Sequence, residues 1–219
     1  MPEPRIAPSI LAADFARLGD QVREVVAAGA RVIHVDIMDG HFVPPLSMGP
    51  QVVSALRDLD LGVELDVHLM VERPERHVGD FAKAGAHTIT VHAEATPHVH
   101  YAVQQIREGG CAAGVAVCPS TPLAVYEEVD VDVALCMTVN PGWGGQAYIP
   151  GSTDRIARLR ALLGDGPDLE VDGGIDAATA GPAAGAGATL FVAGSAIFGA
   201  ADPAAAYAEI AAAAGCSQP

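Results

Sequence analysis

The sequence predicts a (β/α)8 barrel, formed as one domain by residues 1–219, and three observations lead to it. Short apolar runs recur along the chain, and most are continuous rather than alternating, which is typical of strands buried on both faces of a parallel sheet. Segments with helical spacing separate these runs. Polar residues collect where the runs stop, and barrels of this kind carry their active sites at the carboxyl ends of the strands.

Eight apolar runs are predicted as the strands of the barrel. They occupy residues 5–10, 32–37, 63–70, 88–91, 112–117, 131–139, 169–171 and 189–193. An open doubly wound sheet is the alternative, but it usually carries a glycine-rich fingerprint after its first strand. Here the first run leads into PSILAADF, which has no such fingerprint. Eight strands that alternate with helices therefore favour the closed barrel.

Helices are expected between the strands. The segments with helical spacing include 15–26, 52–59, 78–84, 99–106, 153–163 and 204–213. Glycines stand at the joints between helix and strand, where a left-handed helix end is useful: Gly29, Gly62, Gly85, Gly110 and Gly187. The uncharged stretch between Asp176 and Asp202 is rich in Ala and Gly and contains Pro182. It is predicted as a helix, a turn, a buried strand and a second turn rather than a membrane span.

The charge balance excludes some classes of partner. The chain has 12 Lys and Arg against 27 Asp and Glu, a net charge of −15, which disfavours nucleic acid and anionic membranes but not a small anion held by backbone dipoles. The four cysteines show no CxxC spacing and are expected to be buried, reduced thiols. The opening MPEPRIAPS lacks the apolar run of a secretion signal, so a cytoplasmic protein is expected.

Histidines and aspartates stand at the ends of several predicted strands. His34 and Asp36 share one face of their strand, and Asp66 and His68 share one face of the next. Asp172 ends the seventh strand. Imidazole and carboxylate groups that converge at one barrel mouth predict a metal site with mixed nitrogen and oxygen ligands.

Four other polar residues stand at or near the ends of the predicted strands. Asp66 either orients a ligating histidine or simply ends its strand, and both readings stay open. His92 and Glu94 follow the fourth strand. They are expected to be hydrogen-bonded residues that support the structure rather than residues that take part in the chemistry. Asp39 falls past the second strand, beside Gly40, and is expected to belong to a turn.

Glycine-rich segments follow the sixth, seventh and eighth strands. VDGGI and VAGSAIF let backbone N–H groups approach an anion closely, and barrels often bind phosphate after these last two strands. The longer segment NPGWGGQAYIP, residues 140–150, is typical of a lid or binding loop. A phosphorylated ligand is therefore expected at the same mouth as the metal.

These motifs resemble one known family. APSILAADFARL, HVDIMDGHFVP, LDVHLMV, MTVNPGWGGQ, EVDGGI and VAGSAIF, in this order over residues 7–198, are similar to ribulose-phosphate 3-epimerases. The resemblance implies interconversion of D-ribulose 5-phosphate and D-xylulose 5-phosphate through an enediolate, in the pentose phosphate pathway or, where present, the Calvin cycle. It also implies one divalent metal ion, which could be Zn, Fe, Mn or Co, and a homo-oligomer, either a dimer or a hexamer.

The resemblance also assigns roles to residues. The implied metal ligands are His34, Asp36, His68 and Asp172, and the implied acid–base pair is Asp36 and Asp172. The implied substrate contacts are Ser9, His68, Gly142, Trp143, Gly144, Gly145, Asp172, Gly173, Gly174, Gly194 and Ser195, with Met38, Met70 and Met137 around the reacting carbons. A shared metal would help to hold one carboxyl ionised and the other protonated, as proton transfer to opposite faces requires.

The chain departs from the family pattern at Trp143, Cys118 and the segment PLSM, residues 45–48. These departures leave the sugar preference open, so a 3-epimerase of a hexulose phosphate such as allulose 6-phosphate is the alternative. A metal-free lyase or synthase is a more distant rival, but the one lysine, Lys83, lies in a predicted helix away from the mouth. A barrel that only binds sugar phosphate would be expected to lack one of the two acid–base carboxylates.

Overall fold

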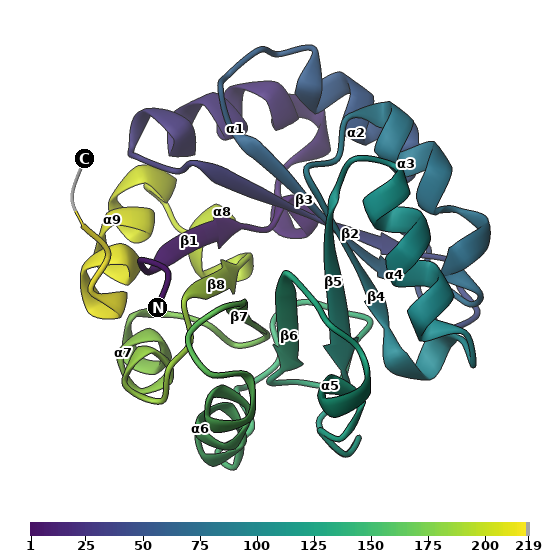
Figure 1. The fold of residues 1–219 in the computed structure, drawn as a ribbon. Helices are drawn as coiled ribbons and strands as arrows, with labels where there is room; N and C mark the ends of the chain where they lie inside the picture. The colour runs from purple at the N-terminus through teal and green to yellow at the C-terminus, as the bar shows by residue number, and fades with distance from the viewer. Residues whose placement is uncertain (218–219) are drawn as a thin grey trace.

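A computed structural model describes residues 1–217 and shows a (β/α)8 barrel (Figure 1). Its eight parallel strands are β1 (Arg5–Pro8), β2 (Val32–Met38), β3 (Glu64–Met70), β4 (Thr88–His92), β5 (Ala112–Val117), β6 (Val133–Met137), β7 (Asp168–Asp172) and β8 (Leu190–Ala193). The ladder runs in the order β1-β8-β7-β6-β5-β4-β3-β2. A parallel bridge between Ser9 and His34 brings β1 beside β2 and closes the ring.

Helices form a ring outside the strands (Figure 1). They are α1 (Leu18–Ala27), α2 (Pro50–Arg57), α3 (Val78–Ala84), α4 (Val99–Glu108), α5 (Val125–Glu128), α6 (Ser152–Leu163), α7 (Ala177–Gly185), α8 (Ser195–Phe198) and α9 (Pro203–Ala214). The last helix, α9, packs beside the first strand, β1. The uncharged stretch forms the predicted helix, α7, and the predicted buried strand, β8, but the turn expected after the strand is the short helix α8. Every helix within residues 1–217 is too short or too polar to cross a bilayer.

Several predicted bounds are wrong by a few residues. The first run ends at Pro8 rather than residue 10, because the Ser9 side chain accepts a bond from the N–H of Leu11, 3.4 Å away, and begins a 3-10 turn. The helix predicted over 15–26 starts as a 3-10 turn capped by Asp14 and becomes α-helical at Leu18. Side-chain caps such as these redirect the backbone at points where the apolar pattern continues.

Glycines end the helices where predicted. Gly85 after α3 and Gly187 after α7 have φ angles of +106° and +105°. A Cβ atom at either position would also lie 2.6 Å from an arginine side chain, that of Arg57 or Arg160. Both the backbone angle and the close approach therefore require glycine at these joints.

The interior of the protein has two regions, one apolar and one polar. The main apolar core lies between the sheet and the helices, where outward-facing residues such as Ile33, Val67 and Ile89 are fully buried. The centre of the barrel instead holds a buried polar group: His34, Asp36, Asp66, His68, Thr90, His92 and Glu170. The register explains this grouping, because His34 pairs with Asp66, and Asp36 pairs with His68, on adjacent strands.

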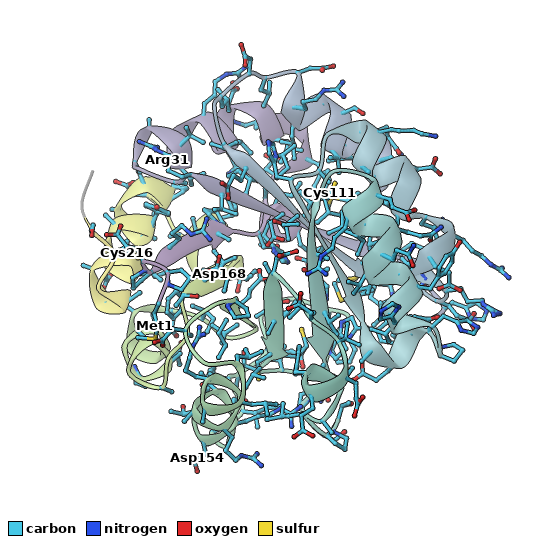
Figure 2. All side chains as sticks on the ribbon, viewed as in Figure 1. Met1, Arg31, Cys111, Asp154, Asp168 and Cys216 are labelled. Carbon is cyan, nitrogen blue, oxygen red and sulfur yellow. The ribbon has the colours of Figure 1, made fainter. Side chains whose placement is uncertain are left out.

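The cysteines are free thiols, as predicted. Cys111 precedes β5 and Cys216 follows α9, on different sides of the ring of helices (Figure 2). The predicted burial is confirmed for Cys111 and Cys136 but is wrong for Cys118 and Cys216, which are partly exposed.

Candidate active site

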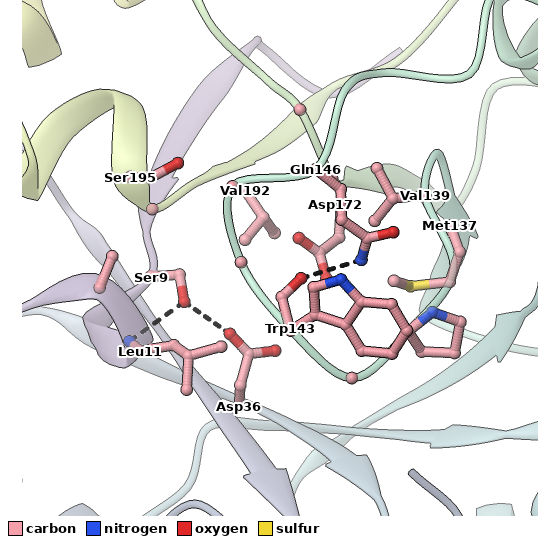
Figure 3. Close-up of a pocket in the computed structure, with 18 of the residues that line it drawn as sticks. Ser9, Leu11, Asp36, Met137, Val139, Trp143, Gln146, Asp172, Val192 and Ser195 are labelled. Atoms are coloured by element: carbon pink, nitrogen blue, oxygen red, sulfur yellow. Dashed lines mark hydrogen bonds between the residues drawn. The ribbon is translucent and has the colours of Figure 1, made fainter. Parts of the chain in front are cut away.

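A cavity of about 300 Å³ opens at the carboxyl ends of the strands (Figure 3). It contains nearly all of the substrate contacts predicted from the sequence: Ser9, Met38, Met70, Met137, Gly142, Trp143, Gly144, Gly145, Asp172, Gly173, Gly174, Gly194 and Ser195. Asp36 also lines it. His68 is the exception, because its fully buried side chain lies beneath the cavity floor. The sequence missed several lining residues on the same loops, among them Leu11, Asn140, Gln146 and Ile175.

The predicted metal ligands come together at the cavity floor. One donor atom from each of His34, Asp36, His68 and Asp172 lies within 4.8 Å of the others. Oδ1 of Asp36 lies 3.3 Å from Nε2 of His34 and 3.3 Å from Nδ1 of His68. Nε2 of His34 is buried and has no hydrogen-bond partner among residues 1–217. This donor set of two imidazoles and two carboxylates fits a divalent cation.

The two carboxyl groups of this cluster have opposite protonation tendencies. Burial alone would raise the pKa of Asp36, but His34 and His68 outweigh it and hold that pKa well below the usual range. Ser9 also donates to Oδ2 of Asp36 at 2.5 Å. Burial, followed by the nearby charge of Asp36, raises the pKa of Asp172 to about 7. Asp36 is thus held ionised while Asp172 holds a proton more readily.

Behind His34 lie two further carboxyl groups. Nδ1 of His34 is 2.7 Å from Oδ2 of Asp66 and 3.3 Å from Oε1 of Glu170. Asp66 therefore contacts the ring nitrogen that faces away from the metal cluster, which favours the orienting role left open above. Glu170 was missed by sequence reasoning. The sequence could have indicated it, because Glu170 is a single charged residue within the apolar run 169–171. It also lies on the same face of the strand as Asp172, two residues later.

His92 lies behind the other histidine. Its Nε2 atom is 2.9 Å from Nε2 of His68, and its Nδ1 atom is 3.2 Å from Oε2 of Glu94. The sequence predicted only a supporting role for His92 and Glu94, and it did not predict this contact between His92 and a candidate metal ligand. Asp39, by contrast, accepts bonds from three backbone N–H groups, those of His41, Phe42 and Glu72, as expected of a turn residue.

The methionines form apolar parts of the cavity wall. Met38 and Met70 pack with Val43, and Met137 packs with Leu135 and Val139. Such a wall limits water beside the two carboxyl groups.

The loop over 140–150 closes one side of the cavity. The side-chain amide of Gln146 donates to the carbonyl oxygens of Asn140 and Trp143 at 2.6 and 2.9 Å, so the loop is held compact. Trp143 is 53% exposed and stands at the rim (Figure 3). Gly174 has φ +66°, and a Cβ atom there would lie 2.5 Å from the backbone nitrogen of Tyr148. Glycine at this position allows the loops after β6 and β7 to meet.

Ser47, one of the departures from the family pattern, acts on the backbone of β2. Its hydroxyl accepts from the N–H of Met38 at 2.8 Å and donates to the carbonyl of Asp36 at 2.7 Å. It therefore steadies the strand end that carries a candidate catalytic carboxylate.

The fold and the site define a (β/α)8-barrel enzyme with a pair of facing carboxyl groups and a candidate metal cluster at the mouth of the barrel. The family model for the ribulose-phosphate 3 epimerase family matches residues 5–198. The chain belongs to this family.

Three relatives carry the name ribulose-phosphate 3-epimerase. The protein of Serratia marcescens is 52% identical over 199 residues, which cover 89% of this chain and 95% of the relative. That of Bacillus subtilis (strain 168) is 47% identical over 94% of this chain and 97% of its own. That of Escherichia coli (strain K12) is 50% identical, over 88% of each chain.

More distant solved structures share the barrel fold. KGPDC from Streptococcus mutans in complex with D-R5P has a TM-score of 0.76 at 17% identity, covering 97% of both chains. The 3-hexulose-6-phosphate synthase of Salmonella typhimurium has a TM-score of 0.74 at 18% identity, covering 96% of this chain and 98% of its own. At these identities the likeness concerns the fold alone.

Proposed function

We propose that this chain interconverts D-ribulose 5-phosphate and D-xylulose 5-phosphate by proton transfer at C3, with Asp36 and Asp172 as the acid–base pair. The observation that carries the proposal is that these two carboxyl groups face one cavity, within 4.8 Å of each other, with opposite pKa shifts. The names and identities of the relatives support the same reaction.

Epimerisation requires a proton to leave one face of C3 and another to arrive on the opposite face. Ionised Asp36 is suited to accept the first proton, and protonated Asp172 is suited to donate the second. The hydrogen bond from Ser9 holds Asp36 in place for this transfer. In the reverse reaction the two residues exchange roles, which their shared cavity allows. The methionine wall keeps competing water from the enediolate.

His34, Asp36, His68 and Asp172 would hold one divalent metal ion, which could be Zn, Fe, Mn or Co. When bound, such an ion supplies a Lewis acid that stabilises negative charge on the substrate oxygens. The ligands stand on or directly at the ends of β2, β3 and β7, and strand-borne ligands hold their geometry more rigidly than loop residues.

The substrate phosphate would bind at Gly173, Gly174, Gly194 and Ser195, which line the same cavity as Asp36 and Asp172. The glycine loop over 142–145, with Trp143, would cover the sugar. Trp143 is also the observation that keeps a hexulose phosphate as the alternative substrate, because it alters the rim of the cavity. Comparing turnover of ribulose 5-phosphate and allulose 6-phosphate separates the two.

The remaining expectations complete the proposal. The chain acts as one catalytic domain, in the cytoplasm, as a homo-oligomer, and without nucleic acid or membrane as a partner. Light scattering after size exclusion measures the oligomeric state, because a dimer and a hexamer of this 22.3 kDa chain differ threefold in mass.

Solvent-deuterium exchange at C3 tests the assignment. The unaltered enzyme should incorporate deuterium into ribulose 5-phosphate and form xylulose 5-phosphate. Asp36→Asn should lose both, by roughly 10²- to 10⁴-fold. Asp39→Asn is the matched control, since that carboxylate stands on the same strand end but holds only backbone N–H groups. Because Asp36 is also a candidate ligand, metal content is measured in each variant. Undiminished exchange in Asp36→Asn would refute its role as base.

A further inference from the structure

The two ring nitrogens of His68 face different groups. Nδ1 lies 3.3 Å from Oδ1 of Asp36 and 3.7 Å from Oδ2 of Asp172, within the candidate metal cluster. Nε2 points the other way and lies 2.9 Å from Nε2 of His92. His68 can bind a metal through Nδ1 only if that nitrogen carries no proton. The tautomer of His68 therefore decides whether the cluster is complete.

His92 is held rigidly for this contact. Its ring is fully buried and lies against the ring of Phe42, with centroids 4.8 Å apart. Its Nδ1 atom lies 3.2 Å from Oε2 of Glu94. The string of contacts thus runs from the metal cluster through His68 and His92 to a carboxylate.

Glu94 is anchored at its other oxygen. Oε1 accepts from the backbone N–H of Cys118 at 2.7 Å and from the hydroxyl of Thr121. Arg155 holds the same loop by donating to the carbonyl oxygens of Cys118, at 3.0 Å, and Thr121. Oε1 thus accepts two hydrogen bonds, which favours an ionised carboxylate at Glu94.

The positions of the protons follow from this anchor. An ionised Glu94 can only accept, so Nδ1 of His92 donates to it. Nε2 of neutral His92 then has a lone pair and accepts from Nε2 of His68. Nδ1 of His68 is left without a proton, facing Asp36 and Asp172. We propose that Glu94 and His92 are positioning residues that fix the tautomer of His68 with Nδ1 free for the metal. This inference rests on the metal site of the proposed function.

The same residues could be read as a second metal site, because donor atoms of His92, Glu94 and Cys118 also lie within 4.8 Å of one another. A metal on Nδ1 of His92 would move the proton of that ring to Nε2. His68 would then have to accept at Nε2 and carry its proton on Nδ1. While both rings are neutral, a second site here would therefore disable His68 as a ligand of the first. The geometry favours the positioning role.

The variant Glu94→Gln tests the proposal sharply. An amide has one accepting oxygen, and the N–H of Cys118 and the hydroxyl of Thr121 already require it. The amide NH2 would then face Nδ1 of His92 and reverse both tautomers. Cys118→Ala is the matched control, because it removes the thiol, 3.7 Å from Nδ1 of His92, but keeps the backbone N–H. His92→Phe preserves the ring shape and removes the acceptor, which provides a second variant if Glu94→Gln does not fold.

Two readouts are measured on each protein. Nitrogen-15 NMR of the histidine rings in the metal-free protein at pH 8 reports the tautomers, and chelator competition with Mn²⁺ or Zn²⁺ reports metal affinity. The unaltered enzyme and Cys118→Ala should show the proton of His68 on Nε2 and equal affinity. Glu94→Gln should move that proton to Nδ1, and both it and His92→Phe should lose affinity roughly 10- to 100-fold.

Each contrary result has a distinct meaning. An unchanged tautomer and affinity in Glu94→Gln would overturn the positioning role. Two metal equivalents in the unaltered enzyme, one of them lost in Cys118→Ala, would also overturn it in favour of a second metal site. If the unaltered enzyme binds no metal, the metal site of the proposed function fails. The positioning role then fails with it, whatever tautomers are observed.

Discussion

Nδ1 of His34 lies 2.7 Å from Oδ2 of Asp66, and both side chains are buried at the centre of the barrel. This contact directs the opposite nitrogen, Nε2, toward Asp36. The two candidate histidine ligands thus present different atoms to the cluster, Nε2 from His34 and Nδ1 from His68, and each is held from behind by a different partner.

Asp66→Asn should weaken both metal binding and the metal-free fold. The charge-assisted bond to His34 becomes a neutral one, so we expect the free energy of unfolding to fall by about 2 kcal/mol. Metal affinity should fall roughly 10- to 100-fold. Urea unfolding and chelator competition measure the two effects. Asp132→Asn is a suitable control, because its carboxylate accepts a hydrogen bond from the backbone N–H of Ala113 and does not contact His34. Equal losses in both variants would contradict an orienting role for Asp66.

Glu170 should make the stability of the metal-free protein depend on pH. Burial, followed by the charge of Asp66, raises the pKa of Glu170 well above its ordinary 4.5. The folded state therefore binds a proton that the unfolded state releases. Its stabilising contribution is complete below about pH 4.5 and is lost as pH rises toward the raised folded value.

Glu170→Gln should remove this dependence, because its amide is neutral at every pH. Relative to the variant, the unaltered protein should lose up to about 1.4 kcal/mol of unfolding free energy per pH unit above pH 5. Urea unfolding of both proteins from pH 5 to 8, with a chelator present, measures the difference between the curves. Other titrating groups are common to both proteins, so parallel curves would show that Glu170 is not protonated.

Metal removal should lower thermal stability as well as activity. A cation that binds only the folded state at 100 times its dissociation constant stabilises that state by about 2.7 kcal/mol. Chelator should therefore lower the Tm, and adding back Zn²⁺, Mn²⁺, Fe²⁺ or Co²⁺ should raise it. Asp36→Asn protein should show little of this rise. A full rise in that variant would locate metal binding elsewhere.

Much of the fold could be predicted from the sequence, because strands buried on both faces leave continuous apolar runs such as Ala112–Val117, predicted over its observed length. The ends of elements were less predictable, since a cap such as Ser9 acts through one side-chain bond. The short helix α5 had too few turns for a periodic signal. In α7, Ala and Gly dominate every face, so its bounds could not be read from periodicity.

The candidate site was predictable where its residues stand two positions apart on one strand, because such residues share a face. His34 and Asp36 lie two residues apart on one strand, so their common face is evident without a structure. The contact between His68 and His92 was not predictable in this way, because it depends on how two strands align. Glu170 was overlooked for a related reason: its partners, His34 and Asp66, belong to strands far away in the sequence.

The bridge between Ser9 and His34 has a consequence for how the enzyme is made. The sheet runs from β1 directly to β8, so the first strand finds its ladder partner only after nearly the whole chain has been synthesised. Until then the loop carrying Gly194 is missing and β1 lacks its ladder partner, although the bridge from Ser9 to His34 can already form. A nascent or truncated chain that stops before β8 should therefore be inactive, even if its earlier strands have already paired. Activity therefore reports that β8 has paired with β1.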